Sequence, residues 1–472
     1  MRRAIHWFRR DLRLHDNTAL RKAVEQAESV VPVFVVEDAF QTGPDVGAAR
    51  AAFLFKSVSE LDASLHALGQ KLIIRYGRSD VEIPKLAQEL KAQAVFCNKR
   101  YEPYAQARDR RVFNALNSVG VGFELFKDAV IWEEREILTK TQQLYTVFTP
   151  YANAWRSKNF AAPPRNIRKI APCSVEVASH HLPTVDHFGL KLSQSIPNAG
   201  EKAGLRLLDE FIRGKLFHYG DQRDFPAIQG TSQLSPHLRA GTVSIRKVVS
   251  DVLRARAKGN PKQKNNCDTF LNELIWREFY LQILHNFPHV MKGNFRREYD
   301  SLEWSHNESH FAAWKEGQTG YPIVDAAMRC LNATGWMHNR LRMIVAMFLT
   351  KDLLLNWQWG ERYFMQQLVD GDLAANNGGW QWSAGTGTDA APYFRIFNPV
   401  TQGMKFDPKG EFIRAWIPEL RDLPNELVHE PWEAGLLAAR YPVRIVLHKD
   451  QRAKALDIYA RIKSSRTSPR EP

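Results

Sequence analysis

The feature that most constrains this chain is a change of hydrophobic period near residue 130. Before it, short apolar runs alternate with segments of helical period. The runs are Ala4–Phe8, Val30–Val36, Leu72–Tyr76 and Ala94–Asn98, and the helical segments are Asn17–Ala27, Ala49–Leu68 and Val81–Leu90. Strands that alternate with helices predict a parallel, doubly wound, Rossmann-like sheet.

From about residue 201 onward, strand-like alternation nearly disappears and helical periodicity dominates. Examples are Lys202–Arg213, Asp268–His285, Tyr321–Leu331 and Asn339–Leu355. We therefore expect an α/β domain over residues 1–130, a linker over 131–200, a large all-α domain over 201–465 and a polar tail over 466–472.

Composition narrows the class of partner. Lys and Arg together number 65 against 51 for Asp and Glu, and the formal charge of +14 favours a polyanion such as nucleic acid. A merely solubilising surface is the alternative. No run of 18 apolar residues and no signal-like start occurs, so a cytoplasmic protein without a membrane span is expected.

Several common sites are not supported by the sequence. The four cysteines, Cys97, Cys173, Cys267 and Cys330, are widely spaced with no C-x-x-C pair, which argues against zinc and a disulfide framework. The first predicted strand is followed by neither G-x-G-x-x-G nor a P-loop, so neither nucleotide motif is indicated. We predict no metal.

Tryptophan is concentrated in one region. Eight of the 13 tryptophans lie between residues 276 and 382, namely Trp276, Trp304, Trp314, Trp336, Trp357, Trp359, Trp380 and Trp382. Core packing explains any one of them. Several stand among polar residues, however, which is typical of a wall that stacks on flavin or nucleobase rings.

Two predicted helical faces mix rings with polar groups. The first joins Glu273, Trp276, Arg277 and Tyr280, and the second joins Trp336, Asn339, Arg340 and Met343. Either face could line a ligand, and either could be a partly exposed, salt-bridged helix.

Two further segments suit a ligand. Asp370–Trp382 contains D-G-D and N-N-G-G, which indicate a helix end where backbone can approach a ligand closely. In Gly230–Leu238, Ser235 is predicted as an N-cap with Pro236 at the first helical position, and its hydroxyls and free N–H groups can hold a diphosphate.

Taken together, these segments resemble the DNA photolyase/cryptochrome family, specifically the class I bacterial photolyases that repair cyclobutane pyrimidine dimers. The resemblance runs over nearly the whole chain. Its matching stretches are Trp7–Asn17, Arg223–Pro226, Gly230–Ser235, Asn272–Tyr280, Thr319–Met343, Asp370–Trp382 and Ala391–Pro399.

The resemblance implies an N-terminal antenna domain and a helical domain that holds FAD, used in its reduced form. Asn376 matches the asparagine that faces flavin N5 and tunes the cofactor. The implied FAD contacts are Tyr219, Thr231, Ser232, Gln233, Leu234, Ser235, Arg342, Asp370, Gly371 and Asp372.

The resemblance also implies light-driven electron transfer from reduced FAD to a dimer flipped out of single- or double-stranded DNA. Glu273 would hydrogen-bond the dimer. The other residues implied to contact lesion or strand are Arg223, Trp276, Arg277, Tyr280, Asn339, Arg340, Met343, Trp382, Arg395 and Gln402. Trp380, Trp357 and Trp304 match the chain that photoreduces oxidised flavin.

Alternatives stay open at this point. A cryptochrome photoreceptor is the second reading of the same resemblance, and an aromatic-rich nucleic-acid binder without chemistry is the third. Three alternatives stay open for the antenna site: deazaflavin, 5,10-methenyltetrahydrofolate, or no bound antenna. Tyr104-Ala105 replaces the Asn-Glu pair of folate-type members, while Lys292 matches a folate-contacting lysine. We expect a monomer.

Overall fold

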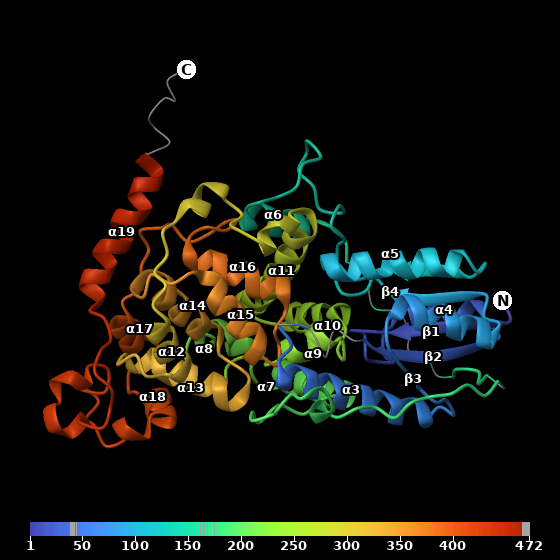
Figure 1. Cartoon of the computed structure of the whole chain (residues 1–472), viewed down its shortest axis with the longest axis horizontal. Helices are drawn as coiled ribbons and strands as arrows, with labels where there is room; N and C mark the ends of the chain where they lie inside the picture. The colour runs from blue at the N-terminus through green and yellow to red at the C-terminus, as the bar shows by residue number, and fades with distance from the viewer. Residues whose placement is uncertain are drawn as a thin grey trace.

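The structure is a computed structural model that describes residues 1–37, 43, 45–160, 163, 167, 169–173 and 175–464. The predicted tail over 466–472 lies outside these residues. Figure 1 shows a sheet-containing half at the N-terminus beside a larger helical half that ends in α19 (His448–Ser464).

The first half alternates strands and helices. Its elements are β1 (Arg3–Phe8), α1 (Thr18–Gln26), β2 (Ser29–Val36), α3 (Ala48–His66), β3 (Ile73–Tyr76), α4 (Ser79–Leu90), β4 (Ala94–Asn98), α5 (Pro103–Asn117) and β5 (Gly122–Phe126). The strands form one sheet in the order β3-β2-β1-β4-β5, and each pair of neighbouring strands is parallel. The predicted α/β fold is confirmed.

Side-chain alternation explains why helices cover both faces of the sheet. Ala4 and Phe8 of β1 pack in one core with α1 and α3, whereas Ile5 and Trp7 pack in another with α4 and α5. Two elements were not anticipated. α5 is rich in Arg, and β5 is a largely exposed edge strand without an apolar run.

The second half is built almost entirely from helices. Its α-helices are α6 (Phe148–Ser157), α7 (Glu201–Gly214), α8 (Tyr219–Gln222), α9 (Ser235–Ala240), α10 (Ile245–Lys258), α11 (Pro261–Asn286), α12 (Glu308–Glu316), α13 (Pro322–Thr334), α14 (Asn339–Met347), α15 (Trp357–Gln367), α16 (Leu373–Ala384), α17 (Pro399–Phe406), α18 (Glu411–Trp416) and α19. Short helical turns lie between them, including the π-helical turn η5 (Phe348–Asp352).

Helix α11 is the axis of the site. It begins with a capping box, in which the Asn260 side chain accepts from Gln263 N and the Gln263 side chain accepts from Asn260 N, followed by Pro261 at the first helical position. Over 26 residues it packs on α6, α8, α10 and α16. α11 therefore brings together segments that are far apart in the sequence.

Buried ion pairs join the two halves. The Arg13 guanidinium lies 2.5 Å from the Asp128 carboxylate, and Arg246 of α10 lies 2.8 Å from Asp128 and 3.1 Å from Asp16. These side chains come from the loop after β1, from the segment after β5 and from the helical half. The joint is therefore a network rather than a single contact.

A buried carboxyl group provides a second joint. Glu278 of α11 accepts hydrogen bonds from Ile131 N at 2.6 Å and Trp132 N at 3.0 Å, and from Trp155 Nε1 at 2.8 Å. Burial outweighs these hydrogen bonds and raises its pKa to about 7. Glu278 thus ties α11 to the segment that leaves the sheet and to α6.

Two features are absent from the part of the chain that the structure describes. None of the helices there is both long and apolar enough to cross a membrane. Within the same ranges, no three His, Cys, Asp or Glu side chains are grouped as a metal ion would need.

Candidate functional site

A cavity in the helical half has a volume of about 490 Å³. Its walls come from α8, the loop before α9, α9, α11, α14, α15 and α16. Nineteen of the residues to which the resemblance assigns a role line it: Tyr219, Arg223, Thr231, Ser232, Gln233, Leu234, Ser235, Glu273, Trp276, Arg277, Tyr280, Asn339, Arg342, Met343, Asp370, Asp372, Asn376, Trp380 and Trp382.

Hydroxyl groups line one end of this cavity. Thr231 and Ser232 precede α9, and Ser235 is its first residue. The predicted N-cap is therefore wrong by one position: Leu234 occupies the cap and makes no side-chain hydrogen bond. Because the Ser235 side chain does not cap the helix, its hydroxyl is free to meet a ligand.

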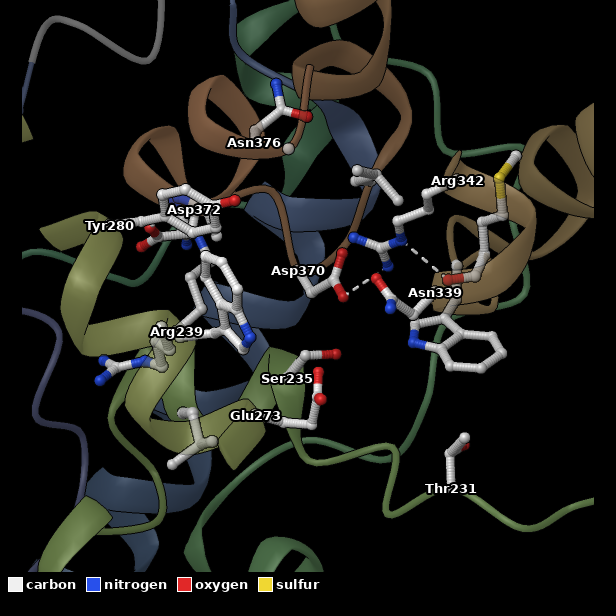
Figure 2. A pocket seen from close by; sticks show the side chains of 18 of the residues that line it. Thr231, Ser235, Arg239, Glu273, Tyr280, Asn339, Arg342, Asp370, Asp372 and Asn376 are labelled. Atoms are coloured by element: carbon white, nitrogen blue, oxygen red, sulfur yellow. Dashed lines mark hydrogen bonds and ion pairs between the residues drawn. The ribbon is translucent and has the colours of Figure 1, made fainter. Parts of the chain in front are cut away.

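An ion pair lies at the centre of the cavity. Arg342 Nη2 donates to Asp370 Oδ2 at 2.8 Å, and Figure 2 shows the two side chains meeting. The other oxygen of Asp370 is buried, and within the described ranges it has no hydrogen-bond partner. Such an orphaned acceptor is expected where a ligand hydroxyl or amide completes the site.

The start of α16 brings a third group of residues to the cavity. Asp372 caps the helix by accepting from Ala374 N and Ala375 N. One turn on, Asn376 Nδ2 donates to the Glu361 carbonyl at 2.9 Å, so the amide is held in place while lining the cavity. In the view of Figure 2, Asn376 and Thr231 lie at opposite ends of the drawn side chains.

The adjacent glycines of α16 have opposite surroundings. A Cβ on Gly378 would lie 2.1 Å from the Tyr280 ring, so ring and backbone touch only because no side chain intervenes. A Cβ on Gly379 would meet nothing within 4 Å and would project into open space at the cavity wall. One glycine permits packing, and the other leaves room for a ligand.

A polar and aromatic edge forms another side of the cavity. Arg223 Nη1 donates to Glu273 Oε1 at 2.7 Å, and the Arg223 guanidinium lies over the Tyr219 ring at 5.4 Å. Trp276 stacks on Phe148 with ring centroids 3.7 Å apart and planes 4° apart. One face of the indole is therefore covered, and only the other remains for a ligand.

The three tryptophans of the predicted relay differ in depth. Trp380 lines the cavity yet is only 2% exposed, Trp357 is 1% exposed, and Trp304 is partly buried against the same core. The Trp357 Nε1–H donates to Asn294 Oδ1 at 3.0 Å. The Trp380 and Trp314 ring centroids lie 6.1 Å apart, although no role was predicted for Trp314.

Six of the residues to which the resemblance assigns a role do not line the cavity: Gly371, Arg340, Arg395, Gln402, Trp304 and Trp357. Gly371 acts through its carbonyl, which accepts from Arg239 Nε at 2.9 Å. Arg340 pairs with Asp224 at 2.7 Å, Arg395 is exposed, and Gln402 lies on α17.

The sequence reasoning missed several lining residues. Arg239, Phe270, Phe364 and Leu368 were not singled out. Arg239 stands four residues after Ser235, a helical spacing that could have revealed it. Trp336 does line the cavity, but it precedes α14 rather than sharing a helical face with Asn339 as predicted.

These features together suit an elongated, polar and aromatic ligand. Hydroxyls and the Arg239 and Arg277 guanidiniums can meet phosphates, the orphaned Asp370 oxygen and the Asn376 amide can meet hydrogen-bonding groups, and Gly379 leaves space. The residues present therefore fit the flavin dinucleotide that the resemblance implies.

The chain is similar to known proteins over nearly its whole length. Residues 4–168 match the family described as DNA photolyase, and residues 270–461 match the FAD binding domain of DNA photolyase. The deoxyribodipyrimidine photo-lyase of Escherichia coli (strain K12) is 43% identical over an alignment that covers 96% of this chain and 97% of the relative.

Solved structures are also similar. A bacterial class III photolyase from Agrobacterium tumefaciens superimposes with a TM-score of 0.91 at 37% identity, covering 98% of both chains. An archaeal photolyase from Sulfolobus tokodaii with two FAD molecules has a TM-score of 0.86 at 34% identity, covering 97% of this chain and all of the other.

Proposed function

The chain belongs to the DNA photolyase family, and we propose that it is a light-driven enzyme that splits cyclobutane pyrimidine dimers in damaged DNA. The observation that carries the proposal is a single cavity in which the Asn376 amide, the Glu273 carboxylate and the buried Trp380 ring all take part. Reduced FAD, when bound and excited by light, supplies the electron that opens the cyclobutane ring and receives it back.

The chain's own residues would hold the cofactor. Thr231, Ser232 and Ser235 offer hydroxyls to the diphosphate, while Arg342 orients Asp370 toward the cavity. The Glu361 carbonyl engages the amide nitrogen of Asn376, which favours presenting the amide oxygen to the flavin. The remaining assigned contacts are Tyr219, Gln233, Leu234, Gly371 and Asp372.

Other residues would hold the lesion. A flipped dimer would need to be wedged beside rings and hydrogen-bonded, and Trp382, Met343 and Asn339 line the cavity on this side. Glu273 is half-buried and positioned by Arg223, so its carboxylate can accept hydrogen bonds from the thymine N–H groups. The open face of Trp276 offers a stacking surface.

Two arginines and one glutamine around the cavity suit the flanking strand. Arg340, Arg395 and Gln402 lie outside the cavity itself, as expected for contacts to phosphates on either side of a flipped base. Together with Arg277 and Tyr280 they complete the assigned DNA contacts. We propose both single- and double-stranded damaged DNA as substrates, and a monomer in the cytoplasm as the working form.

We also propose the domain division at residues 130, 200 and 465, supported by the end of β5 at Phe126 and the start of α7 at Glu201. A second chromophore, deazaflavin or methenyltetrahydrofolate, remains part of the proposal. The S. tokodaii photolyase, whose second FAD is interpreted as a light-harvesting cofactor, adds flavin to the candidates. An absorption spectrum of purified protein would distinguish them.

The test of the function is repair in vitro. Pre-reduced protein is mixed with a dimer-containing oligonucleotide, and thymine absorbance is followed under blue light and in the dark. We expect recovery of absorbance only in the light, and slower recovery for Glu273→Ala. A flavin-loaded protein that restores nothing would favour the photoreceptor alternative.

A further inference from the structure

Five arginines from both halves of the chain gather behind the cavity. They are Arg10 in the loop after β1, Arg50 on α3, Arg100 after β4, Arg239 on α9 and Arg277 on α11. Arg50 and Arg100 are each 8% exposed. Three of the five belong to the α/β half, although the cavity is lined by the helical half alone.

Contacts connect this arginine cluster to the cavity wall. Arg239 and Arg277 line the cavity directly. Arg10 Nη1 lies 3.6 Å from Asp372 Oδ2, and Asp372 is also a lining residue. A Cβ on Gly371 would lie 2.5 Å from Arg50 Nη1, so Arg50 touches the same residue whose carbonyl holds Arg239 from the other side.

Carboxylates balance only part of these charges. Glu102 pairs with Arg10 at 2.7 Å and with Arg100 at 2.6 Å, and Asp372 faces Arg10. Asp370 is engaged by Arg342. The hydrogen bonds described for Arg50, Arg239 and Arg277 all go to backbone carbonyls, those of Met365, Asp45, Gly371 and Ala129.

The uncompensated charge has an energetic cost. Burial lowers the pKa of Arg50 to about 10, and the Arg10 guanidinium lowers it further in the same direction. Burial also lowers the pKa of Arg239, with Arg10 and Arg50 adding to the effect. Asp45, Asp372 and Asp370 offset part of the charge at Arg50. The Asp45 side chain is half-exposed, however, Asp372 also faces Arg10, and Asp370 is engaged by Arg342. A buried group of like charges needs an anion.

We infer that Arg10 and Arg50 of the α/β half are part of the FAD site, so that binding of the dianionic diphosphate and docking of the two halves stabilise each other. The inference rests on FAD as the cofactor. The inference adds Arg10 and Arg50 to the FAD site, although neither lines the cavity, because their positive charges attract the diphosphate. By reciprocity, whatever domain docking contributes to FAD affinity, FAD contributes equally to docking.

The first test measures FAD affinity of apoprotein by quenching of flavin fluorescence. We expect Arg10→Gln and Arg50→Gln each to weaken binding roughly tenfold, within the usual range of coupling between sites. Arg50→Lys should restore most of the loss, because it keeps the charge. The matched control is Arg75→Gln, which removes a buried arginine of the same half that pairs with Glu89.

The second test needs no substitution. Hydrogen exchange is compared with and without FAD for α3 and for the loop after β1, with α4 as an internal reference. We expect FAD to slow exchange in the first two segments and to leave α4 unchanged.

The outcomes separate the two levels of the proposal. Wild-type affinity in both glutamine variants, equal weakening by Arg75→Gln, or exchange unaffected by FAD would each overturn the inference. A wild-type protein that does not bind FAD at all would instead contradict the proposed function.

Discussion

The two halves of the chain form their cores by different rules. In the sheet half, residues of one strand such as Ile5 and Phe8 point to opposite faces of the sheet. Each face is packed with aliphatic and aromatic side chains. In the helical half, rings press on bare backbone: a Cβ on Gly360 would lie 2.0 Å from the Trp380 ring, and Gly378 meets Tyr280 in the same way.

The difference shows how each half relates to chemistry. A core based on alternation tolerates exchange among similar aliphatic residues, because it requires only volume and pattern. Where an aromatic ring packs directly on a glycine, even one added methyl group would clash with it, so the position of the ring is tightly constrained. The helical half therefore positions a site, and the sheet half supplies a scaffold and charge.

The largest expected effect concerns Trp380. Trp380→Phe keeps an aromatic ring in the core but removes the indole, so photoreduction of oxidised, FAD-loaded protein should fall to the background rate. Repair by pre-reduced protein should persist. Flash photolysis measures the first and oligonucleotide repair the second. Trp314→Phe is the control, because Trp314 is a buried neighbour of Trp380. Loss in Trp314→Phe with normal photoreduction in Trp380→Phe would reject the assigned relay.

Glu278 tests the joint between the halves. The pKa of Glu278 is about 7 in the folded protein, against an ordinary value of 4.5. Below pH 4.5 the carboxyl group is protonated in both the folded and the unfolded chain, so its burial costs no stability through ionisation. As pH rises toward 7 the unfolded chain ionises first, and stability falls by roughly 3 kcal/mol in total. Urea unfolding across this range should show the slope in wild type and not in Glu278→Gln. The same pH dependence of unfolding free energy in wild type and Glu278→Gln would contradict this role of Glu278.

Substitutions at Gly378 and Gly379 separate the effect of tight packing from the effect of space for a ligand. Gly378→Ala forces a methyl group into the Tyr280 ring and should cost about 1–3 kcal/mol. Gly379→Ala meets open space and should stabilise the apoprotein helix by up to about 1 kcal/mol while weakening flavin retention. Thermal unfolding of apoprotein and flavin content after gel filtration measure the two effects. Equal stability changes would remove the distinction.

The smallest expected effect lies in the sheet. Ile5→Val removes one buried methylene from β1 and should cost about 0.5–1.5 kcal/mol. Flavin content and repair should not change, because Ile5 packs against α4 and α5, away from the cavity. A loss of flavin in this variant would show that the sheet core is coupled to the site more tightly than its packing suggests.

Hydrophobic period was enough to predict most of the architecture. Four of the five strands and the helices between them are near their expected positions, because a parallel sheet covered on both faces needs continuous apolar runs. β5 was not predicted because it is an edge strand and mostly exposed, so its sequence has no continuous apolar run.

The site was predicted in large part by motif resemblance and only partly by spacing. Helical spacing predicted that Glu273, Trp276, Arg277 and Tyr280 share one wall, and all four line the cavity. It could not place Trp336 beside Asn339 correctly, because the chain turns before α14 begins. Nor could it show that Phe148 covers one face of Trp276, since the two residues lie on different helices.

The sequence by itself therefore determined the two-part fold and most of the residues that face the cavity, since both depend on local period and on motif identity. Only the tertiary structure decided which charges are compensated. Arg10 and Arg50 approach the cavity wall from the other half of the chain. How far carboxylates compensate their charge depends on contacts between segments far apart in the sequence, such as Arg10 with Asp372 and Arg50 with Gly371. Charge balance is a property of the assembled interior, and no local pattern encodes it.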